Sequence, residues 1–175
     1  MPLHIVIDRY NLIRQSLTFS VIERRSLEEG RDALLECIAS YKRLKHHPIT
    51  VVFDGADADT HMERRTRRRG IHILFSRPGE SADSVIKRIV IRERERSVVV
   101  TSDREIVDFA AKHGAATIES IEFENKMKMA VHPDMNQADF SDREGGGWTP
   151  TTRKKGPSHR RSKRERKSHA RTKKL

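Results

Sequence analysis

The chain has 175 residues and a formal net charge of +11, and hydrophobic and charged residues each make up 35% of it. This length is typical of one domain with a single buried core. No stretch approaches the roughly 20 apolar residues of a membrane-spanning helix, and Asp8 interrupts the first apolar run too early for a secretory signal. We therefore expect a cytoplasmic protein rather than a membrane or secreted one.

The positive charge is concentrated in the last quarter of the sequence. Residues 131–175 contain 13 Lys/Arg and 5 Asp/Glu, and residues 151–175 contain no isoleucine, valine or methionine. A segment with so little apolar surface to bury does not offset the entropy lost on ordering. The sequence therefore predicts a folded domain over residues 1–132 and a disordered basic tail over residues 133–175, with Gly145-Gly146-Gly147 as a flexible joint.

Short apolar runs alternate with helical patterns along the predicted domain. Strands are predicted at residues 3–7, 49–53, 71–75, 98–100 and 115–118. Helices are predicted at residues 27–45, 81–95, 103–113 and 122–130, and the polar link 56–70 is expected to be a loop. Ser26 and Ser102 each begin a capping-box pattern, with Glu29 and Glu105 at the third helical position. Strands that alternate with helices of crossover length indicate an α/β fold with a largely parallel sheet.

Three of these strands lead into an aspartate, at Asp8, Asp54 and Asp103, and Asp83 opens a predicted helix. Aspartate is common at turns and helix starts for hydrogen-bonding reasons alone. However, the carboxyl ends of parallel strands share one edge of a sheet, and ligands bind there. Several carboxylates on one edge repel each other unless a cation lies between them.

A divalent cation at that edge would suit chemistry on phosphate. Mg²⁺ and Mn²⁺ prefer oxygen ligands, and such ions activate water and stabilise the leaving oxygen of a phosphodiester. We therefore expect Asp8, Asp83 and Asp103 to bind metal or to orient metal-bound water. Glu80 could add a carboxylate, and Asn11 could hold the first turn or hydrogen-bond a phosphate.

Two basic segments suggest a polyanionic partner. The arginine run before the third predicted strand is either a solvated loop or a clamp for phosphates, and the tail indicates nucleic-acid binding with steep salt dependence. The candidate RNA-binding residues are Arg64, Arg65, Arg67, Arg68, Arg69, Arg153, Lys154, Lys155, Arg160 and Arg161.

Four segments taken in order resemble the motifs of YacP-like NYN domains, which are relatives of PIN-domain nucleases. They are IVIDRYNLI at 5–13, VVFDG at 51–55, SADSVI at 81–86 and VVTSD at 99–103. The resemblance covers roughly residues 1–130. It implies a PIN-like three-layer sandwich around a mostly parallel five-stranded sheet, with the strands in the order 3-2-1-4-5.

The same resemblance implies an activity and a site. It implies an endoribonuclease that depends on Mg²⁺ or Mn²⁺ and cuts single-stranded RNA, with Asp8, Asn11, Asp83 and Asp103 as catalytic residues. Asp54 matches the second motif and is a further candidate metal ligand. The basic tail would then attach the protein to RNA or to ribosomes.

One residue departs from the family pattern, because Arg9 follows the first aspartate where the family usually has glycine. Glycine adopts backbone conformations that arginine avoids. Arg9 could also pair with Asp8, lower the pKa of that carboxyl and compete with a metal, or it could face the RNA backbone. A catalytically weakened RNA-binding module with the same fold therefore stays open as the alternative.

Two other classes of enzyme that act on phosphate fit the sequence less well: one lacks a required residue, and the other is excluded. A haloacid-dehalogenase-like phosphatase needs a second aspartate two residues after the first, where this chain has Tyr10. A P-loop nucleotidase is excluded, because the sequence has no Gly-x-x-x-x-Gly-Lys stretch.

Overall fold

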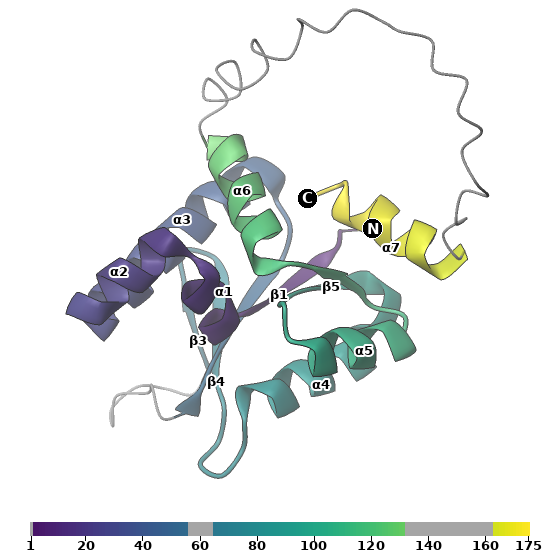
Figure 1. The fold of residues 1–175 in the computed structure, drawn as a ribbon, viewed down its shortest axis with the longest axis horizontal. Helices are drawn as coiled ribbons and strands as arrows, with labels where there is room; N and C mark the ends of the chain where they lie inside the picture. Colours follow the sequence, from purple (N-terminus) through teal and green to yellow (C-terminus); the bar gives the residue numbers. More distant parts are fainter. Residues whose placement is uncertain (1, 56–64, 132–162) are drawn as a thin grey trace, which may run out of the picture.

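The structure, a computed structural model, describes residues 2–55, 65–131 and 163–175. Its sheet has the strand order β3-β4-β2-β1-β5-β6 (Figure 1). Five strands run parallel, and β3 pairs with β4 in the antiparallel sense. The strands are β1 (His4–Asp8), β2 (Ile49–Phe53), β3 (Arg65–Arg68), β4 (Ile71–Phe75), β5 (Ser97–Val100) and β6 (Ala116–Ile118).

The five parallel strands take the predicted order, but the prediction of a five-stranded sheet is wrong. A sixth strand, β3, forms within the link that was expected to be a loop. Its sequence, Arg-Thr-Arg-Arg, gives no apolar signal, because it is an edge strand whose arginines are exposed. Charged side chains are common on edge strands, since they discourage pairing with another chain.

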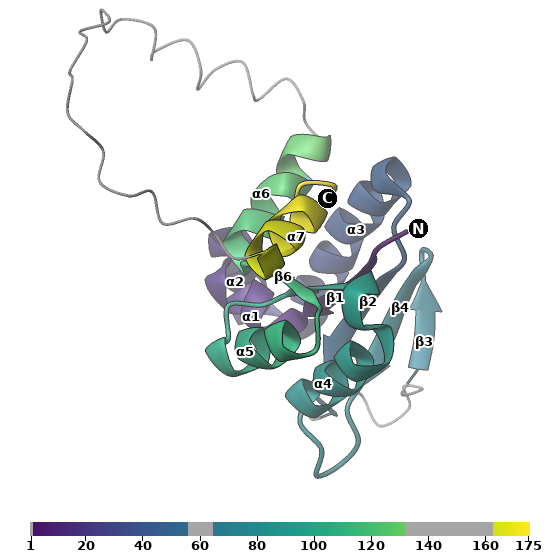
Figure 2. The same cartoon turned by 90° about the vertical axis from the view of Figure 1, so that its right-hand side faces the viewer.

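Helices cover both faces of the sheet (Figure 2). On one face, residues of α1, α2, α3 and α6 pack in one core with Ile5 and Ile7 of β1. On the other face, residues of α4 and α5 pack with Val6 of β1 and Val52 of β2. The helices are α1 (Arg9–Gln15), α2 (Leu17–Arg25), α3 (Leu27–Lys45), α4 (Ala82–Glu93), α5 (Arg104–Lys112) and α6 (Ser120–Val131).

Side-chain caps determine where the helices begin. The Ser26 hydroxyl accepts a hydrogen bond from the Glu29 N–H (3.3 Å), so the predicted start of α3 is confirmed. The predicted cap at Ser102 is wrong, because the Asp103 carboxylate caps α5 by accepting from the N–H groups of Glu105 (2.7 Å) and Ile106 (3.2 Å). An aspartate one residue further on satisfies the same free N–H groups with a full charge.

Two helices, α1 and α2, were not predicted from the sequence. Asp8 caps the seven-residue α1, and the Ser16 hydroxyl caps α2 by accepting from the Phe19 N–H (3.1 Å). Each helix exposes a large apolar side chain, Tyr10 in α1 and Leu17 in α2, so the apolar residues of these helices do not all lie on one buried face. Tertiary packing therefore stabilises them more than propensity does.

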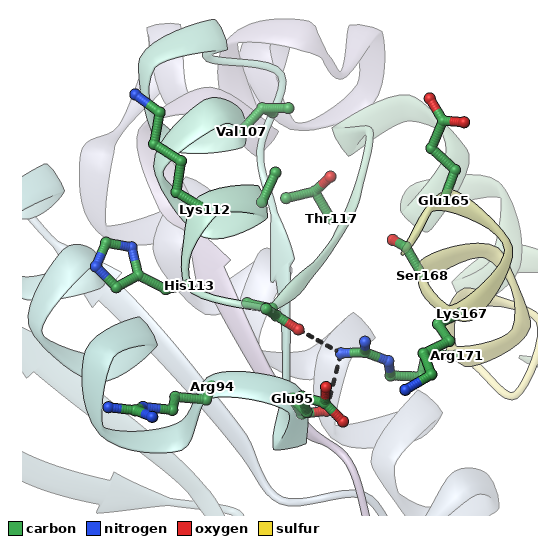
Figure 3. A pocket seen from close by; sticks show the side chains of 13 residues that line it. Arg94, Glu95, Val107, Lys112, His113, Thr117, Glu165, Lys167, Ser168 and Arg171 are labelled. Atoms are coloured by element: carbon green, nitrogen blue, oxygen red, sulfur yellow. Dashed lines mark hydrogen bonds between the residues drawn. The ribbon is translucent and has the colours of Figure 1, made fainter. Parts of the chain in front are cut away.

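Part of the predicted tail packs on the domain. A helix α7 (Lys163–Thr172) lies beside β6, so the prediction of disorder is wrong for these residues. The Arg171 guanidinium donates hydrogen bonds to the carbonyls of Glu95 (2.9 Å) and Gly114 (2.8 Å) (Figure 3). The Leu175 side chain is buried, and its backbone oxygen accepts from the Tyr41 hydroxyl (2.8 Å). One buried leucine and hydrogen bonds to main-chain atoms hold α7 on the domain. The amino-acid composition of the tail does not reveal such contacts.

Where the domain ends, near residue 132, stays a prediction. Within the described ranges, no helix combines the length and the apolar content that crossing a membrane requires.

Candidate active site

The candidate site lies where the strand order of the sheet reverses. β1 pairs with β2 on one side and with β5 on the other, and α/β sheets bind ligands at the carboxyl ends of strands beside such a point. Asp8 is the last residue of β1, and Asp103 follows β5. The topology therefore brings these two aspartates to the same edge, as the sequence predicted.

Asp8 is held rigidly at this edge. The residue is only 5% exposed. One carboxylate oxygen accepts from the Asn11 N–H (3.1 Å), and the other accepts from the Thr101 hydroxyl (3.1 Å). Burial is the main cause that raises the pKa of Asp8, and the charges of Asp83 and Asp103 raise it further against these two hydrogen bonds.

Asp83 lies in the first turn of α4, whose N-cap is Ser81. Its pKa is also raised, first by burial and then by the negative charge of Asp103, with a smaller contribution from Asp54 at the end of β2. Repulsion therefore links all four predicted aspartates. Capping explains Asp8 and Asp103, but it explains neither Asp83 nor the mutual repulsion of the group.

Asn11 holds the chain segments around the aspartates together. Its side-chain carbonyl accepts hydrogen bonds from the Ser102 N–H (3.0 Å), the Ser120 hydroxyl (3.2 Å) and the Gln15 amide (3.2 Å). These contacts join α1 to the loop after β5 and to the start of α6. The structure supports the expectation that Asn11 fixes the first turn, and its contact with a phosphate stays a prediction.

The sequence did not point to the residue that connects the two capping aspartates. The Thr101 hydroxyl donates to Asp8 and accepts from the Asp103 N–H (3.2 Å), and its side chain is fully buried. The one sequence signal for Thr101 is its place between the apolar residues of β5 and Asp103. Without the structure, a threonine at the end of a buried strand is interpreted as a β-branched residue of the core, because such residues are common in strands.

Arg9 does not do what the sequence suggested. It forms an ion pair with Glu23 of α2, its guanidinium lies 5.4 Å from the centre of the Phe53 ring, and the residue is 4% exposed. Arg9 is the first residue of α1. Its backbone does not have the positive φ that would favour glycine at this position. The expected lowering of the Asp8 pKa by Arg9 and the expected backbone strain are therefore wrong, and contact of Arg9 with RNA stays a prediction.

Two charged residues near the aspartates have clear partners. Glu80 pairs with Arg88 and accepts a hydrogen bond from the Arg77 N–H (3.3 Å), and Arg88 lowers the pKa of Glu80. The suggested role of Glu80 as a further metal ligand therefore competes with an existing ion pair. Lys87 lies one helical turn after Asp83 and pairs with Glu105 of α5. The i, i+4 spacing from Asp83 is a signal that could have identified this cation.

The arginine run is divided between two faces of β3. Arg68 pairs with Asp32 (3.4 Å) and Arg69 with Glu36 (2.8 Å), both on α3. Within β3, Arg65 and Arg67 alternate with Arg68 and therefore lie on the opposite face, whereas Arg69 belongs to the turn that follows the strand. The remaining candidate RNA-binding residues lie outside the described residues: Arg64, Arg153, Lys154, Lys155, Arg160 and Arg161.

We call the group formed by Asp8, Asp54, Asp83 and Asp103 the acidic edge. Its carboxylate oxygens suit a hard divalent cation. Among the described residues, no three His, Cys, Asp or Glu side chains converge closely enough to hold one ion by themselves. Mg²⁺ is commonly bound through one or two carboxylates, with waters and substrate phosphates completing its shell. Asp83 and Asp103 add to the raised pKa of Asp8, and Asp103 and Asp54 add to that of Asp83, after burial as the main cause. Such a group fits a cation site, because a cation relieves the repulsion.

The fold and the acidic edge define a nuclease-like α/β domain. The chain belongs to the YacP-like NYN domain family, whose model matches residues 5–172. It is 27% identical over 85 residues to the uncharacterized protein YacP of Bacillus subtilis (strain 168), a match that covers 49% of this chain. The chain spans about half the length of this curated relative, since the match covers 49% of that protein as well.

Solved structures with this fold come from the same organism. The crystal structure of Rae1 (YacP) from Bacillus subtilis has a TM-score of 0.64 and 22% identity, over 78% of this chain and 79% of that one. A mutant of that protein gives a TM-score of 0.63 and 22% identity, over 77% and 80% of the two chains. At this identity the likeness extends to the fold and not to the chemistry.

Proposed function

We propose that this protein is an endoribonuclease that depends on Mg²⁺ or Mn²⁺ and hydrolyses phosphodiester bonds of single-stranded RNA. Asp8, Asp83 and Asp103 carry the metal-dependent chemistry, with Asp54 as a further ligand. The observation that supports this most is that Asp8 and Asp103 meet at the carboxyl ends of the paired strands β1 and β5. Burial first, and then the charges of neighbouring aspartates, raise the pKa of Asp8 and of Asp83. Perturbed carboxylates gathered at the ligand-binding edge of a sheet are typical of a functional site.

The chain's own residues hold the reactive groups in place. Thr101 and the Asn11 N–H fix both oxygens of Asp8, and the cap of α5 fixes Asp103. The bound metal would supply a nucleophilic water and stabilise the leaving oxygen. Lys87, whose charge acts on both Asp83 and Asp103, reduces the negative charge that an approaching phosphate meets.

Attachment to RNA is proposed through the basic segments. These are Arg65 and Arg67 of β3, together with Arg64, Arg153, Lys154, Lys155, Arg160 and Arg161 outside the described residues. Their charge suits RNA alone or ribosomal RNA, and we place the activity in the cytoplasm. Such contacts carry little sequence preference, because they neutralise phosphates.

A non-catalytic RNA-binding module of the same fold is the second candidate. One observation favours it: no three potential ligands in the described part of the chain converge on a single point. The earlier reason for it was that Arg9 could pair with Asp8 and lower the pKa of that carboxyl. This reason loses its support, because Arg9 pairs with Glu23 and the pKa of Asp8 is raised.

The test is cleavage of a labelled single-stranded RNA by the purified full chain with Mg²⁺ or Mn²⁺. We expect cleavage that stops with a chelator and falls at least 100-fold in Asp83→Asn, as expected when a group that stabilises transition-state charge is removed. Asp108→Asn is the matched control, because Asp108 is an exposed carboxylate on α5. Binding of RNA without cleavage under any divalent metal would favour the second candidate.

A further inference from the structure

A basic groove runs between the β3–β4 edge of the sheet and α4. It consists of two adjoining cavities of about 590 Å³ and about 320 Å³, which share Arg65, Leu74, Val85 and Arg88 as lining residues. Figure 2 shows α4 below this edge, with β3 and β4 beside it. Because the two cavities have common walls, we treat them as one continuous feature and call it the basic groove.

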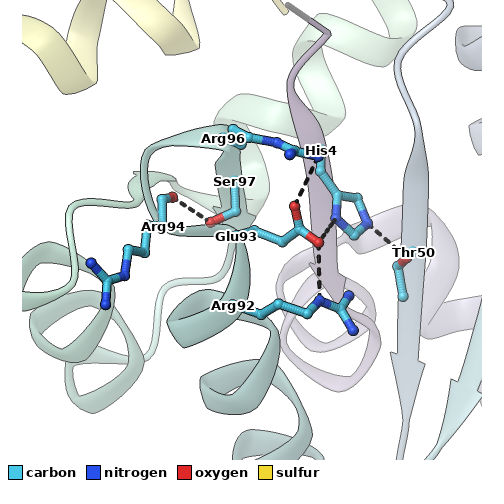
Figure 4. A network of polar contacts seen from close by, with 7 residues as sticks. All are labelled: His4, Thr50, Arg92, Glu93, Arg94, Arg96 and Ser97. Atoms are coloured by element: carbon cyan, nitrogen blue, oxygen red, sulfur yellow. Dashed lines mark hydrogen bonds and ion pairs between the residues drawn. The ribbon is translucent and has the colours of Figure 1, made fainter.

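The groove leads toward the acidic edge. At one end it is lined by His4 and Thr50, near the starts of β1 and β2, and by Arg92 (Figure 4). At the other end it is lined by Phe75, the last residue of β4, and by Arg77 and Glu80. The chain continues from Glu80 into the first turn of α4, which carries Asp83. The groove therefore follows the strand direction over roughly 16 Å, the length of a five-residue strand.

The charge of the groove is positive. Four arginines line it, namely Arg65, Arg77, Arg88 and Arg92. Two glutamates accompany them: Glu80 is paired with Arg88, and Glu93 is shared between Arg92 (3.1 Å) and Arg96 (3.3 Å) (Figure 4). Arg65 has no acidic partner among the described residues. The cations thus exceed the acids, although the groove leads to a cluster of aspartates.

The alternation of β3 directs specific arginines to the groove. Arg65 lies opposite Leu74 and Arg67 opposite His72, and both partners on β4 line the groove. Arg68 lies on the other face of the strand, and the adjoining Arg69, like Arg68, pairs with an acid of α3. Arg65 therefore lines the groove, and the exposed Arg67 lies on the same face of the strand beside it, while their two neighbours pair with acids of α3.

We propose that the basic groove binds the phosphate backbone of single-stranded RNA and delivers it to the acidic edge. This inference rests on the proposed function and adds the path of the substrate. Cations along the groove compensate for the repulsion between the RNA and the aspartates. A polyanion is the occupant that this charge fits, and a single strand suits a groove bounded by an edge strand and one helix.

The test compares two double variants of the full chain that remove the same charge from the same segment. Arg65→Gln with Arg67→Gln changes the groove face, and Arg68→Gln with Arg69→Gln is the matched control on the α3 face. Binding of a labelled 12-nucleotide single-stranded RNA is measured by fluorescence anisotropy across salt concentrations, in chelator so that no cleavage occurs. Thermal unfolding of each variant is recorded beside the wild type.

We expect the groove variant to bind about tenfold more weakly. Its slope of log affinity against log salt should fall by about 1.4, because each phosphate contact on a single strand contributes roughly 0.7. The control variant should bind like the wild type. Equal losses in the two variants, or no loss in the groove variant, would overturn the proposal.

The outcome is separable from that of the proposed function. A wild type that binds through the groove in chelator but does not cut RNA with any metal supports the groove and rejects the nuclease. A wild type that cuts RNA, together with a groove variant of unchanged affinity and KM, supports the nuclease and rejects the groove.

Discussion

Replacing Thr101 with valine tests whether one hydroxyl holds the acidic edge together. Valine keeps the shape of threonine but removes the donor to Asp8 and the acceptor for the Asp103 N–H. A hydrogen bond to a charged group contributes about 1.5–3 kcal/mol, and a neutral one about 1 kcal/mol. Because Thr101 and Asp8 are both buried, water cannot replace these bonds, and we expect the free energy of unfolding to fall by about 2–3 kcal/mol at pH 7.

The control is Thr101→Ser, which keeps the hydroxyl and loses one methyl group, at a cost of about 1 kcal/mol. Urea denaturation of both variants at pH 7 and near pH 3.5 measures the difference. Burial raises the pKa of Asp8 in the folded protein, and the Thr101 hydrogen bond opposes that rise. The stabilisation that this bond gives the charged carboxylate is therefore present above the raised folded pKa of Asp8 and is lost as the pH falls through it. A valine variant as stable as the serine variant at pH 7, or an equal gap at both pH values, would refute this reasoning.

Three further predictions follow from single contacts. Gly55→Ala should destabilise the fold by about 1–3 kcal/mol, measured by urea denaturation, because a Cβ there would lie 2.5 Å from the Ser76 carbonyl oxygen; an unchanged midpoint would contradict it. Tyr41→Phe should speed hydrogen exchange in α7, since it removes the bond to the Leu175 carbonyl; unchanged exchange would show that α7 is held elsewhere. Asp83→Asn in metal-free buffer should raise the free energy of unfolding by a few tenths to about 1 kcal/mol after solvent screening. Its raised pKa means that the charged form is disfavoured in the folded state, so the gain should be present at pH 7 and absent near pH 3; a loss of stability at pH 7 would contradict it.

The parts of the fold with continuous apolar runs were predictable. β1, β2 and β5 are buried on both faces, and β4 alternates buried with more exposed residues, so the sequences of all four indicate strands without any context. The acidic edge followed from them, because parallel strands that end in aspartate place their carboxylates together. β3 was not predictable in this way, since it consists of polar residues and is stabilised by pairing with the edge of β4.

The contacts that arrange the site were not predictable, because they join distant parts of the chain. Asn11 and Ser102 are 91 positions apart in sequence, and Asp8 and Thr101 are 93 apart. The partner of Arg9 was missed for a different reason. Glu23 is 14 positions away, but it lies on α2, a helix that the sequence did not predict.

The most direct measurement for the acidic edge is anomalous diffraction from crystals of the full chain grown or soaked with Mn²⁺. A bound Mn²⁺ ion contacting Asp8, Asp83 or Asp103, directly or through water, is the result that the account predicts, with its peak absent in Asp83→Asn crystals treated in the same way. Saturating Mn²⁺ with no peak at this edge, or a peak that persists unchanged in the variant, would contradict metal-dependent cleavage by these residues.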